Sequence, residues 1–272
     1  GAEALSRLFE FELDLLSQDP AIDGNNLLGE NISVRMLLTS GETRYFNGYV
    51  SSFRAVPGSG QFSHYELSIR PWLWFLSKTS DCRIFQNMTV PDVVKQIFRD
   101  RGFSDFEDRL SASYPTHDYL VQFRETDLNF INRSLEFEGI YYYFEHENGK
   151  HTLVLCDGYS AHEPCRDSSE VKYFPPDDNV LRECLHSWTV NQSLQSTSYL
   201  VNAFDFEKPS ASLLARRNVD REHAKTGLEL YDPEDRYSVP NVGEEYAQKR
   251  VEALASQFEV INASGNVRGL SA

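Results

Sequence analysis

The amino-acid sequence predicts an α+β protein that is mainly β, with two small barrel-like β regions and an α+β unit between them. Three observations predict this class. Residues 9–15 alternate apolar and acidic side chains, as a strand with one buried face does. Residues 90–98 place apolar side chains at helical spacing directly after a capping residue, Thr89. Residues 140–156 combine two apolar strands around an Asn148-Gly149 turn, which predicts a β-hairpin.

The first barrel-like region is expected over residues 1–78. After the strand at its start, further strands are predicted at residues 32–38, 44–53 and 62–69, and a loop is predicted at residues 57–60. Consecutive strands that are joined by turns, without intervening helices, favour a small barrel or sandwich.

The middle unit, residues 79–158, is predicted to contain two helices and the hairpin. The first helix is expected to begin after Thr89 and to stop at Gly102. The second is expected to begin near Thr126 and to end at Gly139, because glycine takes the left-handed cap conformation without a Cβ penalty.

The remainder of the chain is predicted to return to β structure. Residues 159–179 are rich in proline and acidic residues, and they predict a linker or loop. Residues 180–272 are expected to form the second barrel, and a final helix with one apolar face is expected over residues 243–259.

Composition limits the classes of function. The 272 residues are 25% charged and 40% hydrophobic, as in a globular protein. The net charge of −15 argues against nucleic acid as a partner, because phosphate binding needs a concentrated basic surface. We find no apolar run near the roughly 18 residues of a membrane helix, and no signal peptide. The cysteines are too few for a disulfide scaffold and are expected to be reduced: Cys82, Cys156, Cys165 and Cys184.

The sequence contains none of the common catalytic motifs. It has no nucleophile elbow, no phosphate-binding glycine loop and no HExxH pair, so we expect no enzyme, no cofactor and no metal. Glu136 and Glu138 could suggest paired carboxylates, but at this helical spacing they point to different faces. The best zinc candidates are imidazoles and thiols at loose spacing: His146, His151, Cys156, His162 and Cys165.

Three consecutive tyrosines are the candidate inter-subunit contacts. Tyr141, Tyr142 and Tyr143, followed by Phe144, place large aromatic side chains on both faces of one strand. Both faces must therefore be covered, either by the core of the same chain or by another subunit. Both alternatives stay open, since tyrosine is favoured where one end of a side chain stays wet.

The stretch that begins at Glu125 resembles the signature block of one family. A D-L-x-F-I-x-R-x-L-E-x-E-G-I-Y-Y-Y-F segment runs into E-N-G-K-H-T-L-V-L, which is similar to the VgrG spike proteins of type VI secretion. Hub proteins of contractile phage baseplates share the block more loosely. Further resembling segments extend over nearly the whole chain: residues 29–38, 44–50, 204–209, 228–233 and 243–250. The stretch at residues 159–172 is shorter than the family pattern.

The resemblance implies the base of a homotrimeric spike in a contractile injection machine. The chain would sit on a tube of hexameric Hcp rings, with both β regions similar to tube-protein barrels, so that three chains supply six barrels. A needle that pierces a target membrane, together with effector and tip proteins, would follow residue 272. The protein would be cytoplasmic before firing and would then be secreted through the type VI apparatus.

Two other functions stay open. A baseplate hub or late-control protein of a contractile phage tail has the same fold in a different machine. From a different class, a cell-wall hydrolase or toxin would assemble its site from scattered Glu, Asp and His side chains. The full-length gene would distinguish them, since it would show a hydrophobic-repeat needle or a fused lysozyme-like domain.

Overall fold

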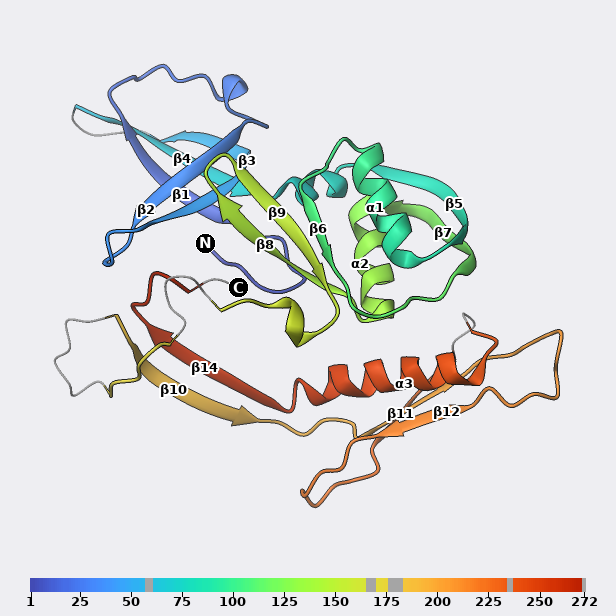
Figure 1. The fold of residues 1–272 in the computed structure, drawn as a ribbon. Coiled ribbons are helices and arrows are strands. Elements are labelled where there is room, and N and C mark those ends of the chain that lie inside the picture. Colours follow the sequence, from blue (N-terminus) through green and yellow to red (C-terminus); the bar gives the residue numbers. More distant parts are fainter. Residues whose placement is uncertain (57–60, 165–169, 176–182, 234–236, 271–272) are drawn as a thin grey trace. The chain divides into compact units, whose positions relative to one another are not determined.

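The protein divides into two compact units in the computed structural model (Figure 1). Unit 1 comprises Gly1–Ser169 with Gly269–Ala272, and unit 2 comprises Glu170–Arg268. The structure describes residues 1–56, 61–164, 170–175, 183–233 and 237–270. The predicted loop at residues 57–60, the candidate ligand Cys165 and the predicted start of the second β region at residue 180 lie outside the described residues.

The first β region is one open, curled sheet of four antiparallel strands in the order β1-β4-β3-β2 (Figure 1). Its strands confirm the predicted ones: β1 (Phe11–Ser17), β2 (Asn31–Leu37), β3 (Thr43–Val56) and β4 (Ser63–Arg70). The buried side chains of Val50, Leu67 and Ile69 lie on one face. Within the described residues the edge strands β1 and β2 do not pair with each other, so one chain supplies half a barrel here.

Both predicted helices of the middle unit begin at the expected caps. The side chain of Thr89 accepts from the backbone of the first turn of α1 (Val90–Asp100), and Thr126 does the same for α2 (Asp127–Glu138). The second helix ends at Gly139, whose φ of 71° is left-handed, as predicted.

The predicted hairpin is present as β8 (Tyr141–Glu147) and β9 (Lys150–Cys156), and β6 (Phe106–Arg109) joins β9 in parallel. A second antiparallel pair was not predicted from the sequence. It consists of β5 (Ser80–Met88) and β7 (His117–Thr126), and we call it the β5–β7 ribbon.

One hydrophobic core joins the first sheet, the two helices and the hairpin. Full burial of each large apolar side chain contributes about 1.5–3 kcal/mol. Because residues from both the 1–78 and the 79–158 segments line this core, the two segments pack as one body. Its most completely buried members include Phe9, Trp72, Leu73, Ile97, Phe98, Phe130, Ile131 and Leu153.

The described residues of unit 2 form two small sheets and one helix. Strand β10 (Leu185–Gln192) pairs antiparallel with β14 (Glu259–Gly265), and β11 (Ser198–Asn202) lies between β12 (Ala215–Asn218) and β13 (Glu229–Pro233). Helix α3 (Pro240–Ala255) packs on β11 and β12.

The final helix was predicted at residues 243–259, and this prediction is wrong at both ends. The helix begins at Pro240, whose fixed φ suits a first turn, and Glu259 already opens β14. In the described part of the chain, no helix has the length and apolar character needed to cross a membrane.

Candidate functional site

The β5–β7 ribbon carries an apolar face that points to solvent. Cys82 lies opposite Phe123 and Ile84 lies opposite Val121 in its register, so these side chains share one face with Tyr119. The side chains on this outer face are exposed to 65% at Ile84, 66% at Tyr119, 39% at Val121 and 63% at Phe123. Exposed apolar side chains that adjoin one another in this way are typical of a surface that binds another protein.

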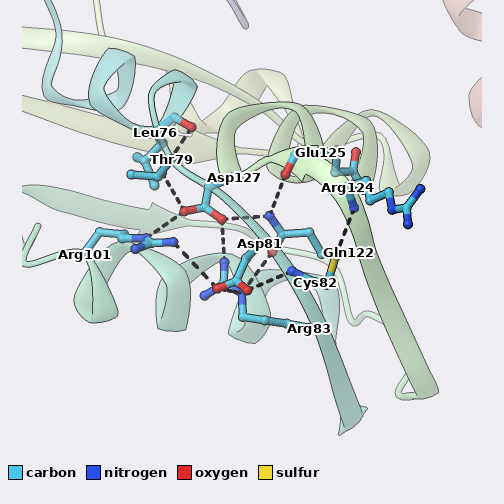
Figure 2. A network of polar contacts seen from close by, with 10 residues as sticks. All are labelled: Leu76, Thr79, Asp81, Cys82, Arg83, Arg101, Gln122, Arg124, Glu125 and Asp127. Atoms are coloured by element: carbon cyan, nitrogen blue, oxygen red, sulfur yellow. Dashed lines mark hydrogen bonds and ion pairs between the residues drawn. The ribbon is translucent and has the colours of Figure 1, made fainter.

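The opposite face of the ribbon is anchored on one buried carboxylate, Asp127 (Figure 2). One oxygen of Asp127 accepts from Arg83 at 2.6 Å and from Gln122 at 2.8 Å. The other accepts from Arg101 at 2.7 Å and from Thr79 at 2.8 Å. These donors come from β5, β7, the end of α1 and the turn before β5, so a single side chain ties four segments to the start of α2.

The charge of Asp127 is strongly stabilised. Burial by itself raises the pKa of this carboxyl, but the hydrogen bonds from Gln122, Thr79 and Arg101 and the charge of Arg83 outweigh it, so its pKa lies below the usual value. Loss of this carboxylate would leave the buried amide of Gln122 and the partly exposed guanidinium groups of Arg83 and Arg101 without the acceptor of these hydrogen bonds.

The free edge of β7 is covered by an ion pair between Glu125 and Arg133. Arg133 Nε lies 3.0 Å from both carboxylate oxygens of Glu125. Its guanidinium also donates to the carbonyl of Val121 at 2.7 Å, and the N–H of Phe123 donates to the Glu125 carboxylate. Side chains therefore satisfy the backbone groups that an added strand would use at this edge.

A second buried hydrogen-bond network connects the hairpin to the first sheet. The N–H of Trp72 donates to His151 Nε2 at 2.8 Å, and His151 Nδ1 lies 2.8 Å from Asn47 Oδ1. Because an N–H can only donate, Nε2 is the acceptor, and the proton of the neutral ring lies on Nδ1. Burial, with a smaller contribution from His146, lowers the pKa of His151 to about 3.

The described zinc candidates do not converge on one point. His151 is occupied as above, while His146 Nε2 lies 3.0 Å from Glu3 Oε1, and His162 Nε2 lies 2.8 Å from the hydroxyl of Tyr141. Burial raises the pKa of Cys156 to about 11, which disfavours the thiolate that zinc requires.

Among the described residues, one group has metal-ligand geometry, and it was not predicted from the sequence. Asp14, His64 and Glu66 bring ligand atoms within 4.8 Å of one another on β1 and β4. Arg54 already pairs with Glu66, and Asp14 is 83% exposed, so this group is explained as a solvated surface cluster.

Glu136 and Glu138 lie in different surroundings, as their helical spacing predicts. Glu138 is buried, with Oε1 3.1 Å from His117 Nε2, whereas Glu136 is exposed. A shared hydrolytic site would need both carboxyl groups to face one cleft.

The three candidate tyrosines are largely covered by their own chain. Tyr142 lies in the core, and the buried Tyr143 accepts from Arg109 at 2.8 Å. Tyr141 is half-buried and donates to the carbonyl of Gly158 at 3.0 Å. The core alternative thus accounts for Tyr142 and Tyr143, and an inter-subunit contact at these positions stays a prediction.

Unit 2 has an apolar face of its own on the β10–β14 pair. Trp188 lies opposite Ala263, and Val190 lies opposite Ile261. Trp188, Val190 and Ile261 are exposed to 51%, 51% and 46%. We call this surface the β10–β14 face.

Known proteins with similar sequences indicate the family of this chain. The model of the phage tail baseplate hub (GPD) family matches residues 2–272. The chain is 45% identical over 271 residues to the type VI secretion system spike protein VgrG1b of Pseudomonas aeruginosa, and 45% identical over 273 residues to VgrG1c. These alignments cover 99% and 100% of this chain but 37% and 38% of those proteins, so the chain spans less than half of their length.

Solved structures agree with this assignment. The E. coli c3393 protein is a type VI secretion component with structural similarity to the T4 bacteriophage tail proteins gp27 and gp5. It matches with a TM-score of 0.60 at 26% identity, over 71% of this chain and 51% of that one. A tail protein from Neisseria meningitidis matches with a TM-score of 0.61 at 15% identity, over 93% and 70%. A chain of a PdpA-VgrG complex matches at 0.52 and 14%, over 84% and 42%. The last two likenesses concern the fold alone.

Proposed function

Because the chain belongs to the phage tail baseplate hub (GPD) family and corresponds to the base region of type VI secretion VgrG spike proteins, we propose a mechanical function. The chain forms the base of a homotrimeric spike and adapts it to the sixfold tube of Hcp rings. Contraction of the surrounding sheath supplies the energy, so the work of the base is to hold position and to transmit force. The needle, the tip protein and the effectors are carried by other parts of the assembled protein.

The observation that carries this proposal is the β10–β14 face. An isolated two-stranded ribbon is only marginally stable, and Trp188, Val190 and Ile261 leave an apolar surface on this one. A neighbouring chain that covers this surface would complete the unit. A ring of three chains needs two different complementary patches on each chain, and the open edges of the first sheet are suited to be the second patch.

Symmetry supports the adaptor function. The first sheet and the β strands of unit 2 are two separate open β regions in one chain. If each is completed to a tube-like barrel in the assembly, three chains present six such barrels to a sixfold tube. The helical part of the middle unit, with α1 and α2, would then project away from the channel.

The test is the mass of the full-length protein by native mass spectrometry. We expect a trimer, and we expect the double variant Trp188→Asp/Val190→Asp to dissociate it, because a charge in a desolvated contact opposes association. The control is Ile84→Asp, at an exposed apolar position of unit 1, which should leave the trimer intact. A trimer that survives the double variant would contradict the proposal.

The two alternatives are distinguished by different observations. A phage-tail hub would share the fold, but the 45% identity to two type VI spike proteins favours the spike. Restored Hcp secretion in a strain that lacks its own spike would support this choice, and failure would favour the tail hub. A hydrolase gains no support from Glu136 and Glu138, which do not face a common cleft.

A further inference from the structure

The proposed spike function gives no role to the outer face of the β5–β7 ribbon. Its outer face exposes Ile84, Tyr119, Val121 and Phe123 beside one another on two paired strands. Large aromatic and aliphatic side chains that cluster in this way have the composition of an interface centre. The four side chains are enough for the energetic centre of a contact, around which a partner would place a polar rim.

The ribbon presents this face as a rigid platform. On the inner side the rings of Phe85 and Phe130 stack with their centroids 5.8 Å apart. Beside them Arg83 and Gln122 are both held by the buried carboxylate of Asp127 (Figure 2). A surface that is fixed from below loses little conformational entropy when a partner binds, which favours recognition.

The two edges of the ribbon differ. At the β7 edge, Arg133 donates to the carbonyl of Val121, and the N–H of Phe123 donates to Glu125. The backbone groups of Val121 and Phe123 therefore point away from β5. Residues that face each other in an antiparallel pair point their backbone groups the same way, either both inward or both outward. The backbone groups of Ile84, opposite Val121, therefore point outward at the β5 edge.

The β5 edge is open along its centre. By the same alternation Gln86, two residues along the strand, also points its N–H and C=O outward. No described residue outside the ribbon donates to or accepts from these groups of Ile84 and Gln86. An unprotected edge next to an exposed apolar face is the arrangement that accepts a strand from another chain.

The charge of Arg124, beside the apolar face, indicates which kind of partner would bind there. Arg124 is the extra residue of a bulge opposite Asp81 and Cys82, and its φ of 51° is left-handed. Its guanidinium lies 5.1 Å from the ring of Phe123, and Figure 2 shows it directed away from Asp127. This places a cation on the rim of the apolar face. An acidic side chain at this position of a partner would complement its charge.

We propose that the β5–β7 ribbon is a docking site for the sheet of a different protein. The edge strand of that partner pairs with β5, and its apolar layer covers Ile84, Val121 and Phe123. An acidic side chain of the partner meets Arg124. This site differs from the β10–β14 face, so the trimer and the docked partner are separate properties.

The experiment uses the full-length protein in the cells that make it, with a benzophenone amino acid in place of Ile84 as the photocrosslinking probe. We expect a cross-link to a different protein. The same probe at Asp118, an exposed position of β7 that does not share the outer face, is the control and should give no such product. Cross-links at Ile84 to another copy of this chain, or none at all, would overturn the proposal.

The cross-linked protein is then purified, and its binding to the spike is measured by calorimetry. Phe123→Asp should weaken binding at least tenfold, and so should Ile84→Asp, while both exposed substitutions leave the trimer and the thermal midpoint unchanged. Arg124→Glu should weaken binding and should be rescued by exchanging an acidic residue of the partner for lysine. On binding, the amides of Ile84 and Gln86 should exchange hydrogen at least tenfold more slowly. Unchanged exchange at both amides in a complex that still forms would refute strand pairing.

Discussion

Units 1 and 2 bury their apolar side chains to very different extents. In unit 1 the main core contains Phe9 and Leu153 and includes residues of the first sheet, both helices and the hairpin. In unit 2 the buried apolar residues are few and mostly small, such as Ala215, Ala247 and Val251, while Trp188 stays half-exposed. The difference indicates that unit 1 is stabilised by its own contacts, and that unit 2 is left for assembly to complete.

The helix N-caps also differ between the two units. Both helices of unit 1 begin at a threonine whose side chain caps the first turn. The N-cap residue of helix α3 in unit 2 is Val239, whose side chain cannot cap the helix, and the first turn of α3 has no acidic residue. Unit 2 is therefore expected to unfold at lower denaturant concentration than unit 1 in the isolated chain.

The largest expected effect is the loss of the Asp127 carboxylate. Asp127→Ala should destabilise unit 1 by about 3–5 kcal/mol, because Arg83, Arg101, Gln122 and Thr79 lose the buried acceptor of their hydrogen bonds. The measurement is urea unfolding followed by tryptophan fluorescence in a Trp188→Phe background, in which the remaining tryptophans, Trp72 and Trp74, belong to unit 1.

Asp81→Ala is the matched control for Asp127→Ala. Asp81 also lies near Arg83 and Arg101, at 3.5 and 3.9 Å, but its side chain is 43% exposed. Its removal should cost less than about 1 kcal/mol. Equal effects of the two substitutions would show that Asp127 is not the anchor of the β5–β7 ribbon.

The same anchor explains why sequence analysis missed this ribbon. Arg83 lies on the inner face of β5, so the strand lacks a continuous apolar stripe, while Ile84 points outward. An arginine on an inner face is predictable only if its distant carboxylate partner is known. The outer-face residues had a weak signal in the exposed apolar alternation of Tyr119, Val121 and Phe123, which sequence analysis did not use.

Elements that depend on neighbouring residues were predicted well. The helix starts at Thr89 and Thr126 and the stop at Gly139 follow from side-chain and backbone chemistry within one turn, and the structure confirms all three. Strand β14 was missed because its sequence, EVINASG, is largely polar. Its partner β10 is also distant in the chain, so local patterns did not indicate the pair.

The stability of unit 1 should decrease in acid because of His151. Its pKa is lowered to about 3 in the folded protein, from an ordinary value of 6.5. Between these values the unfolded chain binds a proton that the folded one does not, so the free energy of unfolding falls as the pH drops below 6.5. The loss is about 1.4 kcal/mol per pH unit, or roughly 2–3 kcal/mol between pH 6.5 and 4.5.

The measurement is the unfolding free energy of unit 1 against pH, compared between the native chain and His151→Gln. Glutamine can accept from Trp72 and donate to Asn47 without titrating, so this variant should lose most of the slope. His186→Gln, at an exposed position of unit 2, should keep it. The carboxyls of Asp127 and Asp157 titrate below their usual value of 3.8, so a range that ends at pH 4.5 avoids them. Identical slopes in all three proteins would contradict the prediction.

The smallest expected effects come from the helix caps, and they act in opposite directions in the two units. Thr126→Ala should destabilise unit 1 by about 1 kcal/mol, because an N–H in the first turn of α2 loses its acceptor. Val239→Ser should stabilise unit 2 by about 0.5–1 kcal/mol. Val239 already has the extended backbone of a cap (φ −115°, ψ 125°), so a serine hydroxyl can accept from the first turn of α3.

Val239 is 53% exposed, so removing its side chain costs little burial. Trp188 fluorescence reports the midpoint of unit 2 if Trp72 and Trp74 are replaced by phenylalanine, and Val239→Ala separates the added hydroxyl from the lost methyl groups. A higher midpoint for Val239→Ser than for Val239→Ala shows that the start of α3 limits the stability of unit 2. If the two midpoints agree, the limit lies instead in the uncovered β10–β14 face. A neighbouring chain, rather than a cap, would then have to supply the missing stability.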